Sequence, residues 1–68
     1  MKLSARTQFV GKVVEIKEGA VNASVKIEIA KDVVISSTIS MEAVKELGLT
    51  VGAEATAVIK ATSVMVMA

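Results

Sequence analysis

The sequence predicts an all-β domain, built as a five-stranded barrel with one short helix between the third and fourth strands. Three observations support this class. Residues 8–17 have a strand-like pattern, and apolar residues alternate with more polar ones along residues 21–29 and 53–61. One short stretch carries signals for the start and end of a helix, and no proline interrupts the pattern. A chain of 68 residues allows one domain, so we expect residues 1–68 to form a single unit.

The first two strands should form an antiparallel hairpin. Residues 8–17 carry apolar side chains on both faces, which predicts a strand partly buried on each side. Glu18-Gly19-Ala20 is typical of a turn, in which Gly19 can adopt a positive φ. Residues 21–29 then show the most regular alternation, which predicts one buried and one exposed face. The expected inward residues are Val21, Ala23, Val25, Ile27 and Ile29, and the expected outward residues are Asn22, Ser24, Lys26 and Glu28.

The third strand, residues 33–39, is β-branched at most positions and is followed by the helix. Ser40 has the side chain of a helix N-cap. Residues 41–47 fit a short helix that turns Val44 and Leu47 inward, and Gly48 fits the residue just after its end.

Two further strands complete the predicted barrel. On one face of residues 53–61, alanine occupies four of the five positions and Ile59 occupies the fifth. After a turn near Thr62 and Ser63, residues 64–67 should form the fifth strand. Three strands, a helix and two strands is the order of a Greek-key barrel of the oligonucleotide/oligosaccharide-binding type.

The small size and composition favour an oligomer. A domain of this length is marginally stable alone, and Phe9 is its sole aromatic residue. Without cysteine or histidine it has neither a disulfide nor a Cys/His zinc site to stabilise it, and 53% of its residues are hydrophobic. We therefore expect some valines to lie in interfaces between copies.

Several functions are disfavoured by what the chain contains. The net charge is +1 with the signs interspersed, and one aromatic residue cannot form a stacking platform, so nucleic acid is not an expected partner. No apolar run approaches the ~20 residues that span a membrane, and the amino end does not resemble a signal peptide. A Ser4–Lys60 dyad is chemically conceivable, but no nucleophile motif supports an enzyme. The acids are scattered, so no site for a bare metal cation is expected, and Met65 and Met67 fit core packing better than soft-metal ligation.

The two ends of the chain hold a set of hydrogen-bond donors. Arg6, the only arginine, lies two residues from Ser4, so both share one face if the segment is extended. Lys60 and Thr62 lie near the other end. A lone arginine near a terminus is usually a solvated charge, but this second group of donors favours a site. Donors without nearby carboxylates suit a small, fully deprotonated oxyanion.

The same two stretches resemble a known family. Ser4-Ala5-Arg6-Thr7-Gln8 resembles the Ser-Ala-Arg-Asn-Gln motif that opens molybdate-binding Mop domains, and residues 60–65 resemble the family's Lys-Ser-Thr-Asp-Val-Met. The similarity covers essentially the whole chain, as in the stand-alone Mop domains called molbindins. It implies a homohexamer, arranged as a trimer of dimers, that binds molybdate or tungstate at subunit interfaces.

The resemblance also implies site residues and a role. Ser4, Arg6 and Lys60 match family ligand positions, and Thr62 adds a hydroxyl. Ala61 stands where the family often has serine, so only its backbone N–H is available. The family's second kind of site, made of backbone amides, is expected at Gly19-Ala20-Val21. The implied role is cytoplasmic storage or homeostasis of the anion without an organic cofactor, and the alternative is an interaction module for nucleic acid or protein.

Overall fold

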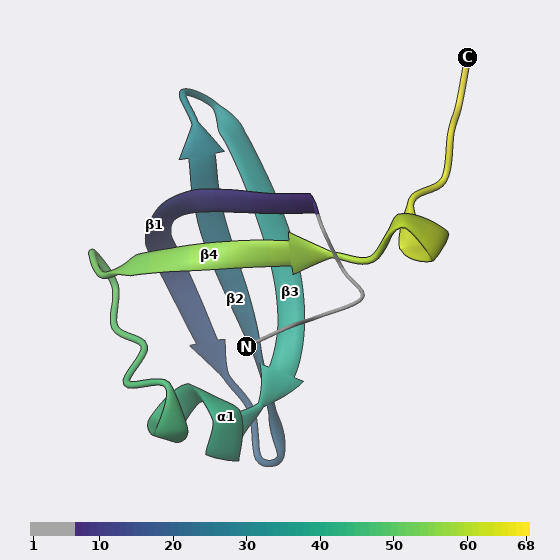
Figure 1. Ribbon diagram of the computed structural model, residues 1–68. Coiled ribbons are helices and arrows are strands. Elements are labelled where there is room, and N and C mark those ends of the chain that lie inside the picture. Colours follow the sequence, from purple (N-terminus) through teal and green to yellow (C-terminus); the bar gives the residue numbers. More distant parts are fainter. Residues whose placement is uncertain (1–6) are drawn as a thin grey trace.

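The computed structural model describes residues 7–68 and shows an all-β fold with four strands rather than five. The strands form one curled antiparallel sheet in the order β3-β2-β1-β4 (Figure 1). A short helix lies between β3 and β4 in the sequence, and a single 3₁₀ turn follows β4. The elements are β1 (Thr7–Glu18), β2 (Asn22–Ala30), β3 (Val33–Ser40), α1 (Met41–Glu46), β4 (Glu54–Ile59) and η1 (Ala61–Ser63).

The curl of the sheet comes from β1, which pairs with a different neighbour along each half. From Thr7 to Lys12 it pairs with β4, and from Lys12 to Glu18 it pairs with β2. The register shifts between Val13 and Glu15, as expected for a β-bulge, and a bulge bends its strand. At Gly11 the backbones come very close, because a Cβ there would lie 2.3 Å from the carbonyl oxygen of Glu28. Gly11 therefore allows β1 to pass from one neighbour to the other.

The concave side of the sheet holds the hydrophobic core. The predicted inward face of β2 is confirmed, since Ala23, Val25 and Ile27 are buried, while Ile29 is half-buried. Val21 precedes the strand and is 72% exposed, so its predicted inward placement is wrong. The buried core consists of Val13, Ala23, Val25, Ile27, Val44 and Ala57, of which Val13 and Val25 are the most completely enclosed large side chains.

The predicted helix signals are confirmed. Ser40 is the N-cap, and its hydroxyl accepts a hydrogen bond of 3.0 Å from the Ala43 N–H. Gly48 adopts a φ of +63° just past the helix, and its N–H donates to the Lys45 carbonyl at 3.1 Å. The helix ends one residue earlier than predicted, at Glu46. Val44 is buried as expected, but Leu47 is 67% exposed, so its predicted inward placement is wrong.

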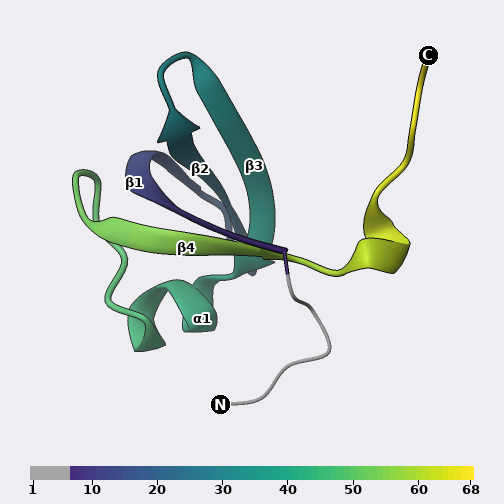
Figure 2. The same cartoon turned by 45° about the horizontal axis from the view of Figure 1, so that its top comes forward.

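The predicted fifth strand is also wrong. Residues 64–67 pair with no strand among the described residues, although Val64 has an extended backbone. The reason is local: η1 forms hydrogen bonds from Ser63 N–H to Lys60 O (2.8 Å) and from Val64 N–H to Ala61 O (3.2 Å), and this turn redirects the chain. Figures 1 and 2 both show the segment after η1 leading away from the sheet. The sheet is therefore curled but open between β3 and β4.

Candidate functional site

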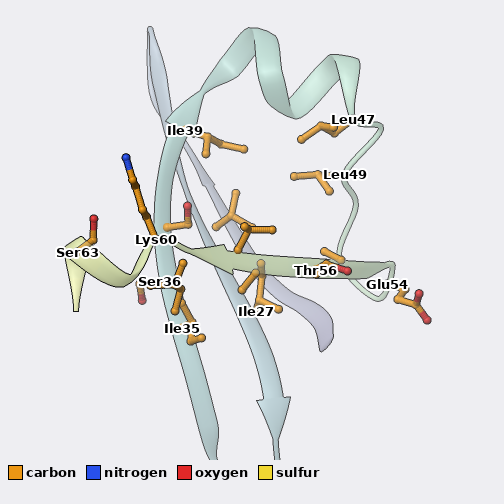
Figure 3. Close-up of a pocket in the computed structure, with 16 residues that line it drawn as sticks. Ile27, Ile35, Ser36, Ile39, Leu47, Leu49, Glu54, Thr56, Lys60 and Ser63 are labelled. Atoms are coloured by element: carbon orange, nitrogen blue, oxygen red, sulfur yellow. The ribbon is translucent and has the colours of Figure 1, made fainter. Parts of the chain in front are cut away.

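A groove of about 690 Å³ lies on the concave side of the sheet, where β3 and β4 remain unpaired. Its walls come from β2, β3 and β4 and from the chain after α1 (Figure 3). Most of the lining is aliphatic, with Ile27, Ile35, Ile39 and Leu49 among its larger members. An apolar groove with few polar groups fits a hydrophobic occupant over most of its length.

The positively and negatively charged groups of the groove lie at opposite ends of β4 (Figure 3). Figure 3 shows Lys60 and Ser63 at one end of β4 and Glu54 at the other. Among residues 7–68, the one ion pair joins Lys26 Nζ and Glu15 Oε2 at 3.0 Å, so no carboxylate of this part of the chain neutralises Lys60. An exposed lysine without a carboxylate partner can attract an anion. The end of the groove that holds Lys60 and Ser63 is the candidate anion site.

The turn after β4 positions the predicted donors of the carboxyl-terminal stretch. Lys60 directly follows β4 and is the N-cap of η1, while Ala61 and Thr62 belong to η1 itself. The first N–H groups of a helical turn have no partner inside it, so Ala61 and Thr62 present backbone donors. Thr62 does not line the groove, whereas Ser63 does. The sequence prediction did not include Ser63 among the donors. Residues i and i+3 of a 3₁₀ turn lie on the same side, so Ser63 faces the same side as Lys60.

The predicted donors of the amino-terminal stretch, Ser4 and Arg6, lie outside the described residues. The register of the sheet nevertheless bears on them. Thr7 pairs with Ile59 at the end of the β1–β4 ladder. In sequence Arg6 directly precedes Thr7, and Lys60 directly follows Ile59. The fold thus places Thr7 opposite Ile59, a pairing that the sequence alone did not reveal.

The second predicted site is separate from Lys60 on the described chain. Gly19, Ala20 and Val21 form the hairpin between β1 and β2, beside α1, because the Met41 N–H donates to the Val21 carbonyl at 2.8 Å. The Gly19 N–H is already engaged with Asn22 O at 2.9 Å. Gly19 does not have a positive φ. A glycine is needed there because the backbone comes close to itself: a Cβ at this position would be 2.6 Å from Asn22 O. Of these three residues, Ala20 and Val21 have backbone N–H groups that donate no hydrogen bond within residues 7–68.

Residues 7–68 contain no cluster of three acidic, histidine or cysteine side chains that could hold a metal ion. None of the helices in this range is long and apolar enough to cross a membrane.

The comparison with protein families decides the relationship. Residues 3–66 match the TOBE domain model, which is nearly the whole chain. The chain belongs to the TOBE family. This TOBE domain is 64% identical over 66 residues to a protein of Haemophilus influenzae named a probable molybdenum-pterin-binding protein. The match covers 97% of this chain and 96% of the relative, and it confirms the predicted resemblance to Mop proteins.

Solved structures agree with that placement. A molybdate-binding protein from Sporomusa ovata is 32% identical, and the alignment covers 100% of both chains with a TM-score of 0.92. The cytoplasmic molybdate-binding protein ModG, solved with molybdate bound, is 49% identical with a TM-score of 0.84. That alignment covers 90% of this TOBE domain and 43% of the ModG chain.

Proposed function

We propose that this chain is a single binding domain, residues 1–68, that holds molybdate or tungstate between the subunits of a homo-oligomer. The carrying observation is the register that pairs Thr7 with Ile59. In sequence these two residues are the direct neighbours of Arg6 and Lys60, so the pairing is compatible with a shared site. The full-length similarity to the Sporomusa ovata molybdate-binding protein supports the same ligand.

The proposed site is built from donors. Arg6 and Lys60 supply positive charge, Ser4 and Thr62 supply hydroxyls, and Ala61 supplies a backbone N–H. Molybdate and tungstate are fully deprotonated at neutral pH and offer acceptors only, so each donor can make a charge-assisted hydrogen bond. Hydrogenphosphate carries a proton that would find no acceptor there, and an unsatisfied buried donor is costly. The site should therefore reject phosphate.

The proposal covers an inorganic anion rather than an organic cofactor. The Haemophilus influenzae relative's name joins molybdenum to pterin. A pterin is a flat heterocycle that binding sites commonly hold by stacking on aromatic rings. This chain has one aromatic residue, Phe9, and it does not line the groove. We propose a binding protein without enzymatic activity that stores the anion in the cytoplasm, the compartment stated for ModG.

The assembly belongs to the proposal as well. We propose a hexamer, built as a trimer of dimers, as the resemblance to Mop domains implies. The many large apolar side chains that are exposed on the described chain, including Val10, Val51, Val64 and Met65, support an oligomer. A second anion site at the β1–β2 hairpin would use the N–H groups of Ala20 and Val21, with Gly19 shaping the turn. Sedimentation should show an oligomer at micromolar concentration, and a folded monomer there would contradict the interfacial sites.

Titration calorimetry tests the ligand. Molybdate and tungstate should bind, whereas phosphate should not, and sulfate reports how far size alone discriminates. Arg6→Ala and Lys60→Ala should each weaken one class of site by roughly tenfold to a hundredfold, because a charge-assisted hydrogen bond contributes about 1.5–3 kcal/mol. Lys60→Arg should not restore full affinity, since a planar fork does not replace a point charge.

A matched control separates the site from general electrostatics. Lys31→Ala removes the same charge from the β2–β3 turn, which is not part of the groove. Its affinity for molybdate should stay within about twofold of the unaltered protein, since exposed charges are screened at physiological salt. If Lys60→Ala and Lys31→Ala gave equal losses, Lys60 would not be a ligand.

A further inference from the structure

Ser63 lines the groove beside Lys60 but is not among the proposed ligands. Figure 3 shows the two side chains at the same end of β4. The Ser63 N–H donates to the Lys60 carbonyl at 2.8 Å, so closure of the η1 turn fixes the spacing of the two residues. Residues three apart in a 3₁₀ turn lie on the same side. One small ligand can therefore meet the Lys60 ammonium group and the Ser63 hydroxyl together.

The hydroxyl of Ser63 is available to such a ligand. The side chain is exposed, and its hydroxyl forms no hydrogen bond within residues 7–68. The backbone N–H of Ser63 is already used to close the turn, so the side chain is the part of Ser63 that can donate. A serine hydroxyl carries one donor and rotates to suit its partner. It can therefore donate to an oxyanion that Lys60 attracts.

The sequence around Lys60 departs from the family motif at two positions, and the two changes complement each other. Ala61 lacks the hydroxyl of the motif's serine, whereas Ser63 carries a hydroxyl where the motif has aspartate. The stretch thus keeps its number of hydroxyls and loses a carboxylate. Since like charges repel, a carboxylate at position 63 would oppose an anion held by Lys60.

We infer that Ser63 is a ligand of the bound oxyanion, and that its hydroxyl takes the place of the one missing at Ala61. The neutral side chain also sets the charge preference of the site, because it leaves the positive charge of Lys60 unopposed at this end of the groove. The inference rests on the proposed function, since it adds a residue to the site proposed there.

Titration calorimetry with molybdate tests the ligand role. Ser63→Ala should bind molybdate about tenfold more weakly, because one hydrogen bond to a charged group is lost. Ser63→Asp should bind on the order of a hundredfold more weakly, because it also adds repulsion. The difference between these two variants should shrink as the salt concentration rises from about 0.05 M to 0.5 M, since salt screens charge and not a lost hydroxyl.

Thr50→Asp is the matched control for the added charge. Thr50 is an exposed hydroxyl residue between α1 and β4 that does not line the groove. The affinity of this variant for molybdate should stay within about twofold of the unaltered protein at physiological salt.

A double variant separates a ligand from a residue that only shapes the turn. Ala61→Ser/Ser63→Ala moves the hydroxyl back to position 61 and should bind molybdate within about threefold of the unaltered protein. If Ser63 acted only on the turn, this exchange would not restore the affinity that Ser63→Ala loses. Urea unfolding and sedimentation of each variant should match the unaltered protein.

The outcomes distinguish the inference from the proposed function. Unchanged affinity in Ser63→Ala, with weak binding in Lys60→Ala, would overturn the inference and leave the proposed function standing. Equal losses in Ser63→Asp and Thr50→Asp would also overturn the inference, as would a failure of Ala61→Ser/Ser63→Ala to regain affinity. An unaltered protein that bound no molybdate would instead refute the proposed function, and the role of Ser63 with it.

Discussion

Among the glycine-to-alanine substitutions, Gly11→Ala should destabilise the protein most. The new Cβ would lie 2.3 Å from Glu28 O, 2.9 Å from Ile27 Cγ2 and 3.0 Å from Glu28 C. Ordinary contact begins near 3.4 Å, so the carbonyl of a paired strand would have to move by about an ångström. We expect a loss of about 3 kcal/mol, the upper part of the range for overpacking. A chain of this length has a total stability of only ~3–10 kcal/mol at 0.05–0.15 kcal/mol per residue.

Gly48→Ala is the matched control, because a Cβ there meets nothing within 4 Å and only the φ of +63° is unfavourable. That conformation costs an alanine about 1–2 kcal/mol. Urea unfolding followed by far-ultraviolet circular dichroism suits a protein without tryptophan or tyrosine, at one fixed protein concentration because assembly contributes to stability. If Gly11→Ala proved no more destabilising than Gly48→Ala, the close passage of β1 over β2 would be wrong.

Three further predictions concern single features. Ser40→Ala should lower the free energy of unfolding by about 1 kcal/mol, because the Ala43 N–H loses its 3.0 Å acceptor. Ser40→Asp should retain most of the stability, since aspartate can also accept at an N-cap. If urea melts showed equal losses for both variants, Ser40 would not act as a cap. Lys26→Ala should change the free energy of unfolding by less than about 0.5 kcal/mol, since Lys26 and Glu15 are each about half exposed. A loss of stability well above about 0.5 kcal/mol in 0.5 M salt would point to a role of Lys26 beyond the ion pair. Single-stranded oligonucleotides should bind no more tightly than the non-specific ~10⁻⁴–10⁻⁶ M at physiological salt, and submicromolar binding in a fluorescence-anisotropy titration would favour the nucleic-acid module instead.

Local features of this protein were determined by the sequence. The alternation of residues 21–29 identified the buried face of β2, because side-chain direction in a strand repeats every two residues whatever the strand packs against. Ser40 and Gly48 marked the ends of α1, since a side-chain oxygen at the start and a positive φ at the end satisfy groups within a few residues. The end motifs likewise predicted the family, because they depend on residue identity alone.

The tertiary structure decided which distant segments meet. The pairing of Thr7 with Ile59, the contact of Gly11 with Glu28 and the shared side of Lys60 and Ser63 all depend on register or on a turn. Residues 64–67 show the limit most clearly. Their composition predicted a strand, but a strand forms only where a partner edge lies within reach, and the η1 turn moves them away from the edge of their own sheet. Strand propensity is a property of the segment, whereas strand pairing is a property of the assembled fold.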